Sequence, residues 1–194
     1  MSRRCVAIVV LLVLASCSGR AGETTTTSIS SNWTTYSDDD ARFQITFPEE
    51  WRPNPNEEAP VGVLFFVGTT LTELTPSVTL AVLENSIPEG ADVDQLASAT
   101  RPQYAPVFVV TDEVEAVVGG RDAVLFHIAE RPTEDQKSRV GIQLLTVVGS
   151  SGWTASCMVE VFDESLIAGE LEICDSVVRT LKITTPTGLT AART

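Results

Sequence analysis

Residues 140–162, VGIQLLTVVGSSGWTASCMVEVF, contain two apolar runs separated by a stretch rich in glycine and serine. The runs 140–148 and 153–162 contain many β-branched residues, and the stretch 149–152 between them has a glycine at each end. Glycine adopts the positive φ that tight hairpin turns require. In the second run every alternate residue from Trp153 to Val161 is apolar, as expected of a strand with one buried face. This segment therefore predicts an antiparallel hairpin that lies against the protein core.

A second hairpin is predicted immediately upstream. Residues 107–118 and 121–130 are two strand-like runs on either side of the pair Gly119-Gly120, which suits a tight turn. Shorter apolar or alternating runs predict further strands at residues 34–36, 43–47, 61–67 and 77–83;. Together these segments predict a largely antiparallel sheet.

Two helices are predicted, one before and one after the hairpins. Asp92 and Gln95 have the spacing of a capping box, and Pro102 is expected to end the short helix that follows;. The last helix is expected to begin near Asp163. Its apolar residues recur at intervals of three and four and form one stripe: Ile167, Leu171, Cys174, Val178 and Leu181;.

The N-terminus has the features of a lipoprotein signal peptide. Arg3 and Arg4 precede an apolar run at residues 5–15, which is too short to span a bilayer as a helix. The run ends in Leu14-Ala15-Ser16-Cys17, which matches a bacterial lipobox at every position. We therefore expect residues 1–16 to be removed and Cys17 to carry the lipid. The alternative is an ordinary secretory signal that is cleaved elsewhere.

The four cysteines then fall into different roles. Cys5 leaves with the signal peptide and Cys17 is lipidated, so Cys157 and Cys174 remain in an oxidising compartment, where a pair of cysteines indicates a disulfide. Cys157 lies on the apolar face of a predicted strand and Cys174 on the apolar stripe of the last helix. A disulfide between them would join the two elements. The alternative is two buried free thiols.

The rest of the chain divides into a tether, a domain and a tail. Residues 17–32 begin with Cys17 and are rich in serine and threonine, so we expect a flexible tether. Residues 33–184 form the folded domain, and residues 185–194 a flexible tail. The formal net charge of −13 disfavours nucleic-acid binding, which requires cationic patches. An acidic surface is also repelled by anionic lipids, so membrane attachment is expected to depend on the lipid on Cys17.

No arrangement of catalytic or metal-binding residues is evident in the sequence. The single histidine, His127, lies within a predicted strand, and nucleophile elbows, paired Cys-x-x-Cys motifs and phosphate-binding loops are absent;. Three consecutive aspartates, Asp38-Asp39-Asp40, could ligate calcium, but they lack the spacing of an EF-hand, and a solvated turn is the expected structure. We therefore predict no enzyme activity, no cofactor and no metal.

The order of these elements resembles the PsbP-like domain. The stretches that carry the likeness are Phe47-Pro48-Glu49-Glu50-Trp51 and Val177-Val178-Arg179-Thr180-Leu181. More narrowly, the chain resembles actinobacterial, mycobacterial-type lipoproteins of the LpqN/LpqT kind, which carry this domain behind a lipobox and a tether. The resemblance covers residues 33–184. It implies an α+β fold, an α/β/α sandwich around a central antiparallel sheet, and membership of larger assemblies as a binding subunit without a shared catalytic set.

These features lead to a leading hypothesis and two alternatives. The leading one is a non-catalytic binding or accessory module for envelope assembly or transport, held by Cys17 at the extracytoplasmic face of the cell membrane, with an envelope protein as its unidentified partner. The first alternative is a carrier that holds a lipid or another small hydrophobic ligand between the sheet and the helices. The second is a hydrolase that uses two carboxylates, such as those of Glu49-Glu50 and Glu57-Glu58, which would have to face one another across a cleft.

Overall fold

The computed structural model describes residues 32–52, 63–69, 72, 76–131 and 138–184. The predicted signal peptide, Cys17, nearly all of the tether, the tail and Glu57-Glu58 lie outside these residues. None of the described helices is long and apolar enough to cross a membrane.

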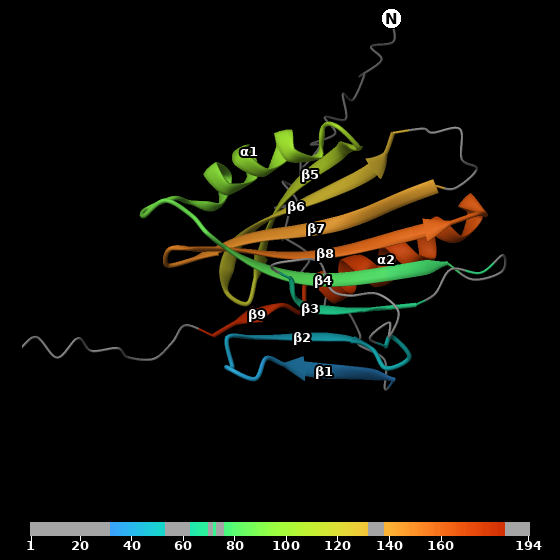
Figure 1. Cartoon of the computed structure of the whole chain (residues 1–194), viewed down its shortest axis with the longest axis horizontal. Coiled ribbons are helices and arrows are strands. Elements are labelled where there is room, and N and C mark those ends of the chain that lie inside the picture. Colours follow the sequence, from blue (N-terminus) through green and yellow to red (C-terminus); the bar gives the residue numbers. More distant parts are fainter. Residues whose placement is uncertain (1–31, 53–62, 70–71, 73–75, 132–137, 185–194) are drawn as a thin grey trace, which may run out of the picture.

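The centre of the molecule is an antiparallel sheet of six strands, in the order β3-β4-β8-β7-β6-β5 (Figure 1). The two predicted hairpins, β5–β6 and β7–β8, form four neighbouring strands, and β4 pairs with β8 along its whole length. The bounds of the strands are β3 Val63–Gly68, β4 Ser77–Ser86, β5 Phe108–Val118, β6 Arg121–Glu130, β7 Ser138–Val148 and β8 Ser151–Val161.

A smaller sheet of three strands has the order β1-β2-β9. β1 (Trp33–Ser37) and β2 (Phe43–Pro48) are consecutive, whereas β9 (Lys182–Ile183) comes from the end of the domain. β9 pairs with the start of β2, where Phe43 lies opposite Ile183. This small sheet therefore joins the first and last parts of the described domain.

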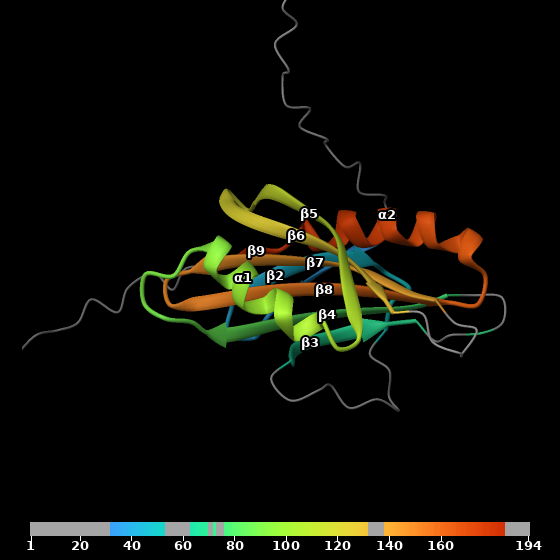
Figure 2. The same ribbon diagram turned by 90° about the horizontal axis from the view of Figure 1, so that it is seen from above.

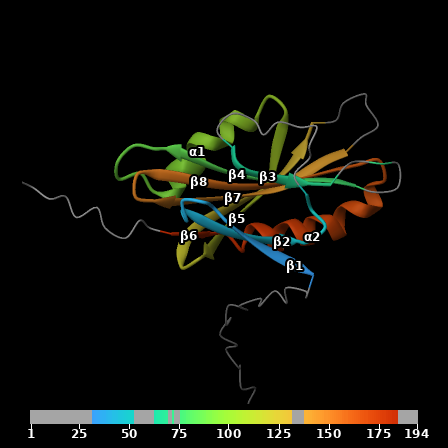
Figure 3. The same ribbon diagram turned by 60° about the horizontal axis from the view of Figure 1, so that its bottom comes forward.

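The molecule has three layers. The helix α1 (Val93–Tyr104) packs on β5, β6 and β7 from one side of the large sheet, and α2 (Ile167–Val178) packs on β7 and β8 from the other. Figure 3 shows α1 on one side of the large sheet and α2 with β1 and β2 on the other. In Figure 2 the helix α2 runs along part of the sheet and does not cover all of its strands. This is an α+β fold with a central antiparallel sheet, as the sequence predicted.

The core follows from the alternation of residues along the strands. Side chains on the α2 face of the large sheet pack with β2 and α2, and many are fully buried, including Leu80, Leu144 and Cys157. A smaller cluster on the α1 face contains Val124, Phe126 and Leu145 with Ala97 of α1. The predicted capping box is confirmed: the Asp92 carboxylate accepts from the Gln95 backbone N–H at 2.8 Å, and the Gln95 side chain accepts from the Asp92 backbone N–H.

The prediction that Pro102 ends the first helix is wrong, because Pro102 lies inside its last turn. A proline there removes the hydrogen bond that its N–H would make to the carbonyl of residue 98. Ser98 is exposed, so that carbonyl is accessible to water, and the helix continues to Tyr104.

The second helix also differs from its predicted length. A turn of 3-10 helix, Glu164–Leu166, precedes α2, and α2 ends at Val178, so that Leu181 lies beyond the helix. Leu181 is nevertheless buried in the same core, which explains why it continued the apolar stripe in the sequence.

The predicted turn at residues 149–152 is too long. Val148 pairs directly with Ser151, which leaves Gly149 and Ser150 as a two-residue turn and places Gly152 in β8. A Cβ atom on Gly152 would lie 2.9 Å from Cγ2 of Ile87, which is closer than packed carbon atoms approach. Gly152 is therefore required by the packing of its neighbours rather than by the turn.

Candidate functional site

Among the described residues, no helix covers one part of the large sheet on its α1 face. Since α1 packs mainly on β5, β6 and β7 and reaches β8 only near Gly152, the side chains at the end of β8 and the start of β4 lie beyond the helix on this face. A hollow of about 280 Å³ lies here and opens to solvent. We call it the sheet-face hollow; its lining residues are Ser77, Thr79, Phe108, Arg139, Met158, Val159 and Glu160.

The register of three strands brings these side chains together. Glu160 of β8 lies opposite Ser77 of β4 on one side and opposite Arg139 of β7 on the other. Two residues further along β8, on the same face, Met158 lies between Thr79 and Gly141. The hollow exists because the neighbours of Met158 are small.

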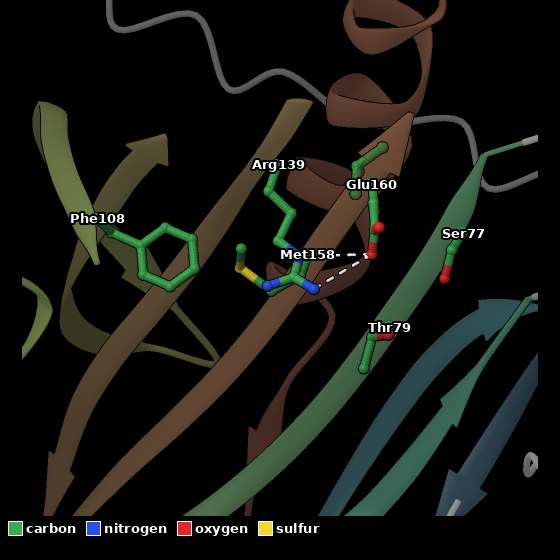
Figure 4. Close-up of a pocket in the computed structure, with 7 residues that line it drawn as sticks. Ser77, Thr79, Phe108, Arg139, Met158 and Glu160 are labelled. Carbon is green, nitrogen blue, oxygen red and sulfur yellow. Dashed lines mark hydrogen bonds and ion pairs between the residues drawn. The ribbon is translucent and has the colours of Figure 1, made fainter. Parts of the chain in front are cut away.

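Gly141 has a direct part in this geometry. A Cβ atom at this position would lie 2.7 Å from the Cys157 carbonyl oxygen and would also collide with the sulfur of Met158. The missing side chain lets Met158 lie flat across β7 and form part of the apolar lining. Phe108, at the start of β5, points from the other side toward Arg139 and Met158 (Figure 4).

The charged side of the hollow is an ion pair. Nη2 of Arg139 lies 3.3 Å from Oε2 of Glu160, and Nη1 of Arg139 lies 3.8 Å from Oε1 of Glu130. Two carboxylates therefore face a single guanidinium. The hollow itself combines apolar side chains, Phe108 and Met158, with hydroxyl groups and the Arg139–Glu160 ion pair, and Glu130 lies beside it.

The polar side chains of the hollow are hydroxyl groups and one ion pair. The lining residues contain neither a histidine nor a cysteine or lysine; the hydroxyl groups are those of Ser77 and Thr79, and the carboxylate is that of Glu160. Across the described part of the chain, no group of three or more histidine, cysteine or acidic residues is placed to hold a metal ion.

The two cysteines predicted to pair are brought together. Cys157 of β8 and Cys174 of α2 form a disulfide, with an S–S distance of 2.07 Å and their Cα atoms 5.4 Å apart. Both residues are fully buried. The bond lies in the core between the large sheet and α2, on the opposite side of the sheet from the hollow.

The aspartate cluster is not a solvated turn throughout. Asp38 is buried, and Nε and Nη2 of Arg42 donate to its two carboxylate oxygens at 2.7 and 3.1 Å. These hydrogen bonds from Arg42 hold the pKa of Asp38 below its usual value. Arg42 also lies 3.7 Å from Asp40 and 3.5 Å from Glu84, so two aspartates of the cluster, Asp38 and Asp40, already face a guanidinium.

The remaining candidates do not assemble into a site. His127 is half-buried in β6, opposite Asp112 of β5. Glu49 and Glu50 lie in an exposed turn after β2. The pKa of Glu170 in α2 is raised, first by its burial and second by the negative charge of Glu50. None of these four residues lines the sheet-face hollow.

Sequence reasoning did not find the hollow. Its signals are small or polar residues where a covered strand would carry apolar ones: Ser77 and Thr79 in β4, and Gly141 within β7. These positions become informative only when the register of the strands is known.

Comparison with known proteins identifies the fold. No family model matches the chain, and no curated protein matches it either. Among solved structures, it is similar to cyanobacterial PsbP (CyanoP) from Synechocystis sp. PCC 6803, with a TM-score of 0.55 and 11% identity over 86% of this chain and 100% of that one.

Two further solved structures are comparably similar. LpqN of Mycobacterium tuberculosis, which is involved in cell envelope biogenesis, has a TM-score of 0.53 and 14% identity over 79% of this chain and 91% of that one. The Saccharomyces cerevisiae Ran-binding protein Mog1p has a TM-score of 0.53 and 10% identity over 79% of this chain and 96% of that one. At these identities the likeness concerns the fold, and the described domain has a PsbP-like fold.

Proposed function

We propose that this protein is a non-catalytic binding module of the cell envelope, held by a lipid on Cys17 at the extracytoplasmic face of the cell membrane. In this proposal it is a lipoprotein of the LpqN/LpqT kind, and it serves envelope assembly or transport by binding another envelope protein. The lipobox in the sequence supports the anchor. The fold that the domain shares with LpqN, a protein involved in cell envelope biogenesis, supports the cellular role.

The observation that carries the binding role is the sheet-face hollow. It offers Met158 and Phe108 to an apolar side chain, and Arg139, Glu160 and two hydroxyl groups to polar atoms around it. Interfaces commonly have an apolar centre with polar groups at its rim. A protein partner that inserts one apolar side chain here, with polar groups around it that meet Ser77, Thr79 and the Arg139–Glu160 pair, fits this arrangement.

A photo-crosslinking residue at Thr79, which lines the hollow, tests the proposal in intact cells. We expect one reproducible crosslinked protein from Thr79 and none from the same residue at Glu172, which is exposed on α2. Equal crosslinking at the two positions, or none at Thr79, would overturn the hollow as the binding site.

The anchor requires its own test. Metabolic labelling with an alkyne fatty acid is expected to label the natural protein and not the Cys17→Ala variant. The same substitution is expected to release the protein from membranes and to abolish the crosslink at Thr79. Labelling that persists in Cys17→Ala would contradict the assignment of the lipid to this cysteine.

The lipid-carrier alternative is not favoured by the described residues. It places the ligand between the large sheet and the helices, but on the α2 side this layer is filled by fully buried side chains such as Phe43 and Ile45. Native mass spectrometry of the full-length protein purified from its own envelope separates the two proposals. A co-purified lipid beyond the one on Cys17 would favour the carrier.

A further inference from the structure

The outer edge of β5 is a second candidate interaction surface, separate from the hollow. β5 is the last strand of the large sheet and has a single neighbour, β6. Within the described part of the chain, no other strand pairs with its outer edge. A strand in this position presents backbone N–H and C=O groups that can pair with an added strand.

The two faces of this edge differ in chemistry. After an irregularity in the pairing between Val110 and Asp112, the α1 face carries Glu113 and Glu115, which lie opposite Phe126 and Val124 of β6. Val114, on the other face, lies opposite Leu125 and is 38% exposed. Along residues 113–116, acidic side chains on the α1 face therefore alternate with apolar side chains on the other face.

Charge disfavours a second copy of this chain as the occupant. If two β5 strands paired antiparallel about Val114, Glu113 of each would lie opposite Glu115 of the other. Like charges directly opposite one another destabilise a strand pair. Arg101 of α1 already forms an ion pair with Glu113, whereas the exposed Glu115 has no ion pair with any other residue that the structure describes.

We propose that the β5 edge binds an extended segment of a partner protein that alternates basic and apolar residues. The segment adds a strand to the sheet through backbone hydrogen bonds. Its basic residues face Glu113 and Glu115, and its apolar residues cover Val114 and Ala116. Val117, which is 70% exposed on the α1 face, would become covered by a longer segment. This inference specifies a kind of partner and therefore rests on the proposed binding function.

Peptide binding to the full-length protein in detergent tests the inference by fluorescence anisotropy. The probe is a labelled eight-residue peptide of alternating lysine and valine. We expect saturable binding that is lost when alternate backbone nitrogens of the peptide are methylated, because methylation removes the donors of the added strand. A peptide of the same composition in which the four lysines precede the four valines, so that the two residue types no longer alternate, is expected to bind more weakly.

Charge reversal distinguishes this edge from general attraction to an acidic protein. Glu115→Lys is expected to weaken binding about tenfold, since it replaces an attractive cross-strand pair by a repulsive one. Glu172→Lys makes the same change of charge on α2 and is expected to leave binding unchanged. A peptide of alternating glutamate and valine is expected to prefer the Glu115→Lys protein.

The peptide measurements would overturn the inference if they gave no saturable binding, equal loss in Glu115→Lys and Glu172→Lys, or insensitivity to backbone methylation. A dimer in light scattering that Glu115→Lys changes would also overturn it, because the occupant would then be a second copy. Failure here while crosslinking at Thr79 succeeds would reject this edge and leave the proposed function intact. Peptide binding without any crosslink in cells would retain the edge and reject the hollow.

Discussion

The Thr180 hydroxyl oxygen accepts a hydrogen bond from the Thr46 backbone N–H at 2.8 Å and lies 3.0 Å from the Thr46 carbonyl oxygen. Thr180 follows α2 by two residues, and Thr46 is in the middle of β2. β9 pairs only with the start of β2, so this hydroxyl takes the place of a strand partner for the next part of β2.

Replacing this hydroxyl is expected to destabilise the domain. Thr180→Val leaves the part-buried Thr46 N–H without its partner and is expected to lower the free energy of unfolding by about 1–2 kcal/mol. Thr180→Ser keeps the hydroxyl and is the control. Urea unfolding followed by tryptophan fluorescence measures both, and equal midpoints for Thr180→Val and the natural protein would contradict the prediction.

The Cys157–Cys174 disulfide is expected to contribute substantially to stability. It closes a loop with a sequence separation of 17 residues, for which the chain-entropy model gives about 3 kcal/mol. Adding a reductant should lower the denaturation midpoint of the natural protein. The double variant Cys157→Ala/Cys174→Ala should have a low midpoint that does not respond to reductant. A natural protein whose midpoint is insensitive to full reduction would show that the bond adds nothing.

Asp38 is expected to make stability depend on pH in the acidic range. Because hydrogen bonds from Arg42 lower its pKa in the folded state, its stabilisation is complete above the unfolded value of about 3.9 and is lost as pH falls through the folded value. Asp38→Asn should therefore be less stable than the natural protein at neutral pH, with a difference that shrinks on acidification. Asp39→Asn, at an exposed neighbour, is the control. A constant difference at all pH values would refute this account.

Glu170 should behave in the opposite way. Burial, and then the charge of Glu50, raise its pKa in the folded state, so its contribution favours folding at low pH and is lost as pH rises through the folded value. Glu170→Gln is expected to be more stable than the natural protein at pH 7 and no more stable below the unfolded pKa of about 4.3. Glu172→Gln on the exposed side of α2 should show neither effect. Thermal unfolding across this pH range provides the comparison.

Gly141 connects the hollow to the stability of the sheet. Gly141→Ala places a methyl group against the Cys157 carbonyl and Met158 and is expected to cost about 1–3 kcal/mol. Gly169→Ala is the matched control, since nothing lies within 4 Å of a Cβ at this helical position and alanine favours a helix over glycine. The melting temperature is expected to fall for Gly141→Ala and to rise for Gly169→Ala. A higher melting temperature for Gly141→Ala would exclude the close packing described for Met158.

Local patterns predicted most of the elements because their causes are local. Two glycine-containing turns between alternating strands predicted both hairpins, and the spacing of Asp92 and Gln95 predicted the start of α1. The alternation of apolar residues along a strand placed Cys157 on its buried face, and the three- and four-residue spacing along a helix placed Cys174 on its apolar stripe. Together these two patterns predicted that the cysteines face one another. Each of these inferences needs only a few neighbouring residues.

Features that depend on distant parts of the chain were not predicted. β9 has only two residues and exists through pairing with β2, so it has no signal of its own. The burial of Asp38 depends on how Arg42 folds back over the turn. The sheet-face hollow depends on the register of β4, β7 and β8 and on where α1 stops covering them, and none of these is encoded in one segment.

The position of β2 between β1 and β9 also constrains the order in which the domain is completed. For a chain that is made or exported N-terminus first, β1 and β2 emerge early, yet Thr46 and the start of β2 wait for partners at Thr180 and β9. The small sheet therefore closes only after nearly the whole domain has emerged. While one side of β2 lacks its partner, we expect this strand to be bound by chaperones. A chain truncated before residue 180 would never complete the small sheet and is expected to be degraded by proteases.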